Sequence, residues 1–102
     1  MRSDTFPWWR QAEADLTSGE FMLVHARWYA ASWFAQQAAE KALKALWIEQ
    51  TTRDPVRTHD VRLLGRSVNA PQHVEQDLTV LFPIFGLTRY PDALGSAPID
   101  SI

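Results

Sequence analysis

The chain has 102 residues, of which 46% are hydrophobic and 12% aromatic, and its formal net charge is −2 at pH 7. This length suits one domain with a small core, and the slightly negative charge excludes a general positive field that would attract nucleic acid. The absence of cysteine excludes disulfides, thiolate metal ligands and a cysteine nucleophile.

The first predicted helix covers residues 7–24. Pro7 is favoured in a first helical turn, and each of residues 3–5 can cap it. The weak helix formers at 17–19 predict a kink or fraying in the middle. Residues 25–27 are predicted to turn the chain into the next helix. The apolar face of the first helix is carried by Trp9, Ala12, Leu16 and Leu23.

The second predicted helix covers residues 28–49 and is almost entirely apolar. Its polar residues follow helical spacing and form a narrow seam along one side, made of Gln37, Glu40, Lys41 and Lys44. A helix with so little polar surface must be covered by other helices. We therefore expect it to be the central helix of an all-α bundle.

Two shorter helices are predicted in the second half, at about 59–68 and 74–88. Residues 50–57 form a loop because Pro55 disfavours a continuing helix. Thr58 is the expected N-cap, with Asp60 in the first helical turn. In the last helix Pro83 and Gly86 predict a bend or an end, and residues 94–102 read as a loose tail. The apolar face of that helix is carried by Leu78, Leu81, Phe82 and Phe85.

The expected fold is therefore one all-α domain over residues 1–102, an antiparallel up-and-down bundle of four helices. No apolar stretch reaches the ~20 residues of a membrane span, and the N-terminus lacks the apolar segment of a secretory signal. We expect a cytoplasmic protein without membrane contact. No spacing of His, Asp and Glu is typical of a metal site, and no cofactor is indicated.

Four separate pieces of the sequence resemble the HEPN domain family, in the expected order: residues 12–16, residues 34–46, Arg57-Thr-His-Asp60 and Thr88-Arg-Tyr-Pro-Asp92. The resemblance implies a bundle of four or five helices that is usually dimeric. It also implies a frequent partner, a minimal nucleotidyltransferase encoded beside the HEPN protein as a toxin–antitoxin-type pair. Some branches of the family are metal-independent ribonucleases with an Arg and a His at fixed spacing on one helix.

The chain departs from the family pattern in two ways. Such proteins usually continue past the Tyr-Pro-Asp turn into another amphipathic helix, whereas this sequence stops at Ile102, as a natural short form or a truncated chain. An apolar groove is then expected to be open or filled by a partner. The ribonuclease spacing is met only by Arg53 with His59 and by Arg66 with His73, and a proline interrupts each pair.

The candidate ligand-binding residues are Lys41, Lys44, Arg57, His59 and Arg89. Lys41 and Lys44 either receive a phosphate or belong to a solvated stripe with a Glu40–Lys44 pair. Arg57 either holds a phosphate or is a solvated loop residue. His59 acts in acid–base or phosphate chemistry, or fixes the loop to the second helix by a hydrogen bond. Arg89 adds a second phosphate contact or belongs to a structural turn.

Three functions follow. The first is a binding module for a nucleotide or for a nucleotidyltransferase partner, with no activity of its own. The second is a metal-independent ribonuclease toxin in which Arg57 or Arg53 meets His59 across a dimer. The third is a structural homo-oligomer that associates through its tryptophan-rich face, where Trp28 and Trp33 are core or interface residues.

Overall fold

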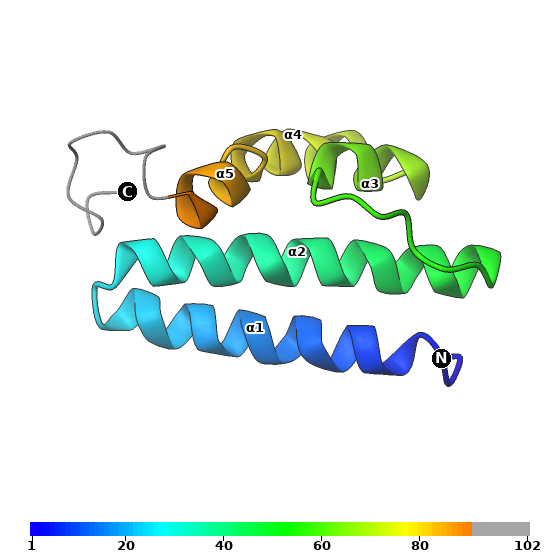
Figure 1. Cartoon of the computed structure of the whole chain (residues 1–102), viewed down its shortest axis with the longest axis horizontal. Helices are drawn as coiled ribbons and strands as arrows, with labels where there is room; N and C mark the ends of the chain where they lie inside the picture. Colours follow the sequence, from blue (N-terminus) through cyan, green and yellow to red (C-terminus); the bar gives the residue numbers. More distant parts are fainter. Residues whose placement is uncertain (91–102) are drawn as a thin grey trace.

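A computed structural model describes residues 1–90, and the predicted tail at 94–102 lies outside the described residues. The described part contains five helices: α1 (Phe6–Val24), α2 (Trp28–Thr51), α3 (Val61–Ser67), α4 (Gln72–Leu81) and α5 (Ile84–Arg89). Figure 1 shows α1 and α2 as a long antiparallel hairpin, with α3, α4 and α5 lying along the other side of α2. The predicted all-α bundle with the second helix at its centre is confirmed.

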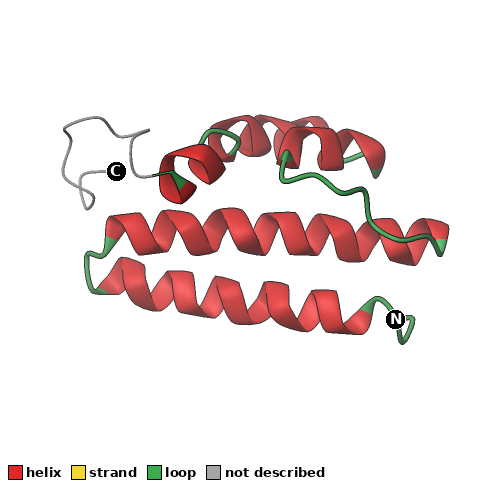
Figure 2. Ribbon diagram, viewed as in Figure 1, coloured by secondary structure: helices red, strands yellow, loops and turns green. Residues whose placement is uncertain are grey.

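The predicted fourth helix is two helices, α4 and α5, with a break at Phe82 and Pro83 (Figure 2). Proline lacks the backbone N–H that a helix interior needs, and its ring clashes with the preceding turn. Of the bend or end that the sequence predicted here, the structure has an end: one helix stops at Leu81 and another begins at Ile84. The separation gives α5 its own direction, and α5 packs on α2.

The third helix begins at Val61, two residues later than predicted, and its N-cap is Asp60 instead of Thr58. The Asp60 carboxylate accepts hydrogen bonds from the backbone N–H groups of Arg62 and Leu63, at 2.9 and 3.3 Å. Thr58 accepts one from the N–H of Asp60, at 3.0 Å. Both residues are good caps, and the tight turn made by Thr58 leaves the capping position to the carboxylate.

The predicted kink near Gly19 is absent, and α1 is continuous from Phe6 to Val24. Gly19 is buried against α2, since a Cβ on it would lie 3.2 Å from Cβ of Phe34. Packing against α2 therefore outweighs the low helix propensity of this stretch. The turn predicted at residues 25–27 is confirmed, with Ala26 at a φ of 56°.

The buried core lies between α2, α3 and α4. It is made of Leu43, Val61, Leu64, Val68 and Leu78. This cluster fixes the short helices, and with them the segment that joins α2 to α3, onto one side of α2. None of the helices in residues 1–90 is both long and apolar enough to cross a membrane.

Candidate functional site

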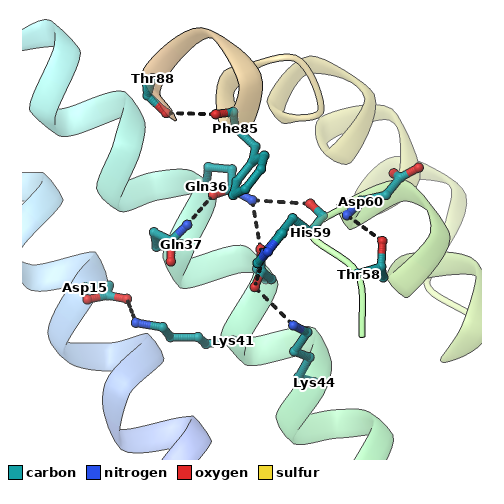
Figure 3. A network of polar contacts seen from close by, with 11 residues as sticks. Asp15, Gln36, Gln37, Lys41, Lys44, Thr58, His59, Asp60, Phe85 and Thr88 are labelled. Carbon is teal, nitrogen blue, oxygen red and sulfur yellow. Dashed lines mark hydrogen bonds and ion pairs between the residues drawn. The ribbon is translucent and has the colours of Figure 1, made fainter. Parts of the chain in front are cut away.

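Glu40, in the middle of α2, is the centre of a polar network (Figure 3). Its carboxylate lies 3.1 Å from Nζ of Lys44 and 3.2 Å from Nε2 of Gln36, both on the same helix. Nδ1 of His59, from the segment before α3, lies 3.0 Å from Oε1 of Glu40. An ionised carboxylate only accepts hydrogen bonds, so a hydrogen bond from His59 to the Glu40 carboxylate requires the proton on Nδ1. Three donors therefore share one buried acceptor.

The ring of His59 is also held by α5. It stacks on the ring of Phe85, with the ring centroids 4.2 Å apart and the planes 13° from parallel. Gln36 contacts the backbone carbonyl of His59 at 3.5 Å. These contacts tie the segment before α3 to α2 and α5, as the structural interpretation of His59 predicts. The side chain nevertheless stays 53% exposed.

A pocket of about 470 Å³ opens beside this network, between the start of α1, the end of α2 and the segment that follows α2. Three of the residues that line it are cationic, Lys44, Arg53 and Arg57, and we call it the basic pocket. Nζ of Lys44 lies 5.7 Å from the ring centroid of Trp8, which also lines the pocket. The remaining lining residues are Asp4, Ile48, Asp54, Pro55 and Val56.

The carboxylate of Asp4 at the pocket rim is already paired. It accepts from Nε of Arg2 at 3.0 Å, and this hydrogen bond lowers the pKa of Asp4 from its ordinary value of 3.8. The charge of Asp4 is therefore partly offset from outside the pocket. Lys44 is likewise paired, with Glu40, so the charges of Arg53, Arg57 and Asp54 matter most in the cavity.

The structure brings some predicted site residues together and separates others. Lys44 and Arg57 line the same pocket, and His59 is joined to Lys44 through Glu40. Lys41 leaves α2 on the other side and pairs with Asp15 of α1 at 2.6 Å (Figure 3). Arg89 lies on α5, with its guanidinium carbon 5.3 Å from the ring centroid of Phe85.

Two pocket residues were not among the predicted ligand contacts. The sequence indicated Arg53 only as a partner of His59, and Trp8 only as one of five tryptophans in the first half of the chain. A signal for Trp8 was present, because consecutive helical residues point about 100° apart and Trp8 therefore lies off the apolar face that carries Trp9. Its presence in the pocket depends on the segment after α2 folding back beside α1.

Neither Arg…His pair lies on one continuous helix, as the prolines predicted. Arg53 and His59 both belong to the segment between α2 and α3. Arg66 is in α3 and His73 in α4, with a turn between them in which Asn69 has a φ of 58°. Among residues 1–90, no group of three or more His, Asp or Glu side chains could hold a metal ion.

The comparisons with known proteins agree with this architecture. The family model of the HEPN domain matches residues 7–98, which takes in all five described helices except the first residue of α1. No curated protein and no solved structure gives a significant match. The match covers most of the chain and includes the Glu40 network and every residue that lines the basic pocket except Asp4. The chain therefore belongs to the HEPN domain family.

Proposed function

We propose that this HEPN domain is a binding module that holds the phosphates of a nucleotide in the pocket lined by Lys44, Arg53 and Arg57. The observation that carries the proposal is the gathering of these three cations around one cavity of about 470 Å³. Guanidinium groups bind phosphate oxygens through paired hydrogen bonds, which gives both affinity and orientation. Lys44 contributes less to the positive field of the pocket than the two arginines, because its ammonium is already paired with Glu40 at 3.1 Å.

Trp8 supports a nucleotide over a free phosphate. Its indole lines the same cavity and lies within reach of the Lys44 ammonium. Aromatic side chains stack on nucleobases with little preference among bases, and a neighbouring cation neutralises the phosphates. In this proposal His59 acts indirectly, because its contact with Glu40 helps to position Lys44.

We also propose where this module acts, which partner it has and how it assembles. The module acts in the cytoplasm as one component of a toxin–antitoxin-type pair, with a minimal nucleotidyltransferase as its partner and with a homodimer as its own assembly. Exposed tryptophans support self-association, since Trp28 and Trp33 are 44% and 36% exposed at the end of the hairpin. Light scattering tests the homodimer, and a monomer at tens of micromolar would contradict it.

Calorimetric titration of the purified chain with ATP, ADP and adenosine tests nucleotide binding. We expect ATP to bind and adenosine to bind at least ~10-fold more weakly, because a charge-assisted phosphate contact contributes about 1.5–3 kcal/mol. Arg57→Gln should weaken ATP binding by a similar factor. The matched control is Arg66→Gln, an exposed arginine of α3 that does not line the pocket. Equal affinities for ATP and adenosine, or no binding by the folded chain, would contradict the proposal.

A second candidate function is the metal-independent ribonuclease. It is favoured by the pairing of His59 with Glu40, because a carboxylate on one ring nitrogen orients the imidazole and leaves the other nitrogen for proton transfer. Arg53 and Arg57 lie in the same segment as His59. An assay of RNA cleavage in the presence of a chelator distinguishes the ribonuclease from the binding module. Activity that is lost in His59→Gln and kept in His73→Gln would replace the binding module with the enzyme.

A further inference from the structure

The α1–α2 hairpin carries a continuous apolar groove. Three cavities of about 290, 520 and 300 Å³ follow one another along the two helices. Trp9 and Ala42 line both the first and the second, while Leu16 and Ala35 line both the second and the third. Because neighbouring cavities share their walls, they form one groove. No residue lines both this groove and the basic pocket.

Along the groove, α1 and its N-cap carry two series of residues, one small and one large, and each series repeats every seven positions. The small residues Thr5, Ala12 and Gly19 are buried against α2. The large residues Trp9, Leu16 and Leu23 are 39%, 53% and 54% exposed. A seven-residue apolar repeat is the pattern by which helices pack side by side in bundles. The small set therefore joins α1 to α2, and the large set remains as a row of exposed apolar side chains.

The floor of the groove comes from α2 and fits the same geometry. It is formed by alanines spaced alternately four and three residues apart, Ala31, Ala35, Ala38, Ala42 and Ala45. Ala31 and Ala45 are separated by about 21 Å along the helix axis, or about four helical turns. A small floor with large side chains on one edge accepts the side chains of another helix laid along it.

Among the described residues, the charged side chains that line the groove are all glutamates. At one end of the groove, the backbone N–H of Arg2 and the charges of the N-terminal ammonium and Arg2 help to lower the pKa of Glu49. Each of the three cavities has a glutamate in its lining, Glu49, Glu13 and Glu20 in turn, and no described lysine or arginine side chain lines any of them. A second copy of this chain, placed on the groove by the same face, would bring carboxylates against carboxylates. Such like-charge contacts disfavour the assembly, whereas basic flanks on the occupant would favour it.

We propose that this groove binds an amphipathic helix of another protein, about four turns long, with an apolar heptad face flanked by lysine or arginine. The site is independent of the nucleotide pocket, since it uses different residues and the opposite kind of charge. The apolar row on α1 provides the contact area, and Glu13 and Glu20 select the charge of the helix that binds.

The probe is a designed peptide of about three heptads, with leucine at the a and d positions and lysine at e and g. The control peptide has the same leucines and glutamate at e and g. Fluorescence anisotropy with the full chain should show the lysine peptide binding at least ~10-fold more tightly. Leu16→Glu should weaken its binding by a similar factor, whereas Val80→Glu, at a 73% exposed position on α4, should not.

If Leu16→Glu fails to fold, a second variant that reverses the charge of two groove residues still tests the proposal. Glu13→Lys together with Glu20→Lys should make the chain prefer the glutamate peptide. Equal binding of both peptides, or no binding of the lysine peptide by the folded chain, would overturn the proposal. Sedimentation adds a third check, because a dimer that Leu16→Glu converts to monomer would show that a second copy occupies the groove.

Discussion

Nζ of Lys44 lies 3.1 Å from Oε2 of Glu40, one helical turn away, and the two side chains are only 9% and 6% exposed. The sequence predicted this i, i+4 pair as part of a solvated stripe, where it would be worth a few tenths of a kcal/mol. The pair does form, but it lies beneath the segment that carries His59. Burial changes its energetics, because neither charge can be left alone there.

Glu40→Gln should therefore lower the free energy of unfolding by about 3–5 kcal/mol, because it leaves the Lys44 ammonium buried without an ionised partner. Urea denaturation measures this difference. Glu13→Gln, at an exposed position of α1, is the matched control and should change the stability little. A loss below about 1 kcal/mol in Glu40→Gln would mean that water reaches the pair in solution.

Two glycines in helices should respond to alanine in opposite directions. A Cβ on Gly65 would lie 2.4 Å from Cδ1 of the buried Leu78, so Gly65→Ala should destabilise the fold by about 1–3 kcal/mol through overpacking. A Cβ on Gly86 meets no atom within 4 Å. Gly86→Ala should therefore stabilise the fold by about 0.5–1 kcal/mol through helix propensity.

Thermal and urea unfolding of both glycine variants checks these signs. Destabilisation by both substitutions would show that α5 does not keep its place on the bundle in solution. Stabilisation by both would show that Leu78 moves aside and that α3 and α4 pack less tightly in solution than in the structure.

Lys41 should matter for stability and not for nucleotide binding. Its Nζ lies 2.6 Å from Oδ2 of Asp15, and the two side chains are 20% and 16% exposed. A double-mutant cycle with Lys41→Gln and Asp15→Asn should give a coupling energy of about 0.5–1.5 kcal/mol. Lys41→Gln should leave the ATP affinity unchanged. A clear loss of ATP affinity in this variant would show that Lys41 contacts the nucleotide.

The N-terminal segment should loosen in acid. The pKa of Glu49 lies below its ordinary value of 4.5, chiefly because the backbone N–H of Arg2 donates to its carboxylate at 3.0 Å. A lowered pKa means that the ionised form is preferred in the folded chain. This contribution to stability is present above pH 4.5 and is lost as the pH falls through the lower, folded pKa.

Melting temperatures of the wild type and of Glu49→Gln between pH 7 and pH 2.5 test this dependence. The wild type should melt higher at neutral pH, and the difference should close in acid. A difference that stays constant over the whole range would show that the carboxylate does not bind the N-terminus.

The candidate site was only partly predictable. Lys44, Arg57 and His59 were identifiable because cationic and titratable side chains stand out on and just after an apolar helix. Trp8 and Arg53 were not predicted as ligand contacts, because they reach the pocket only when the segment after α2 lies beside the start of α1. Their positions are set by a long-range contact that no local pattern encodes.

The sequence by itself determined the all-helical class, the family and the central place of α2, because apolar periodicity, proline and turn residues act within a few positions of the chain. It also placed a break near Pro83, since proline disrupts a helix wherever it stands in its interior. The tertiary structure alone decided what each polar side chain meets. Lys41 and Lys44 are three positions apart on one helix, and that offset sends one to α1 and the other to the basic pocket.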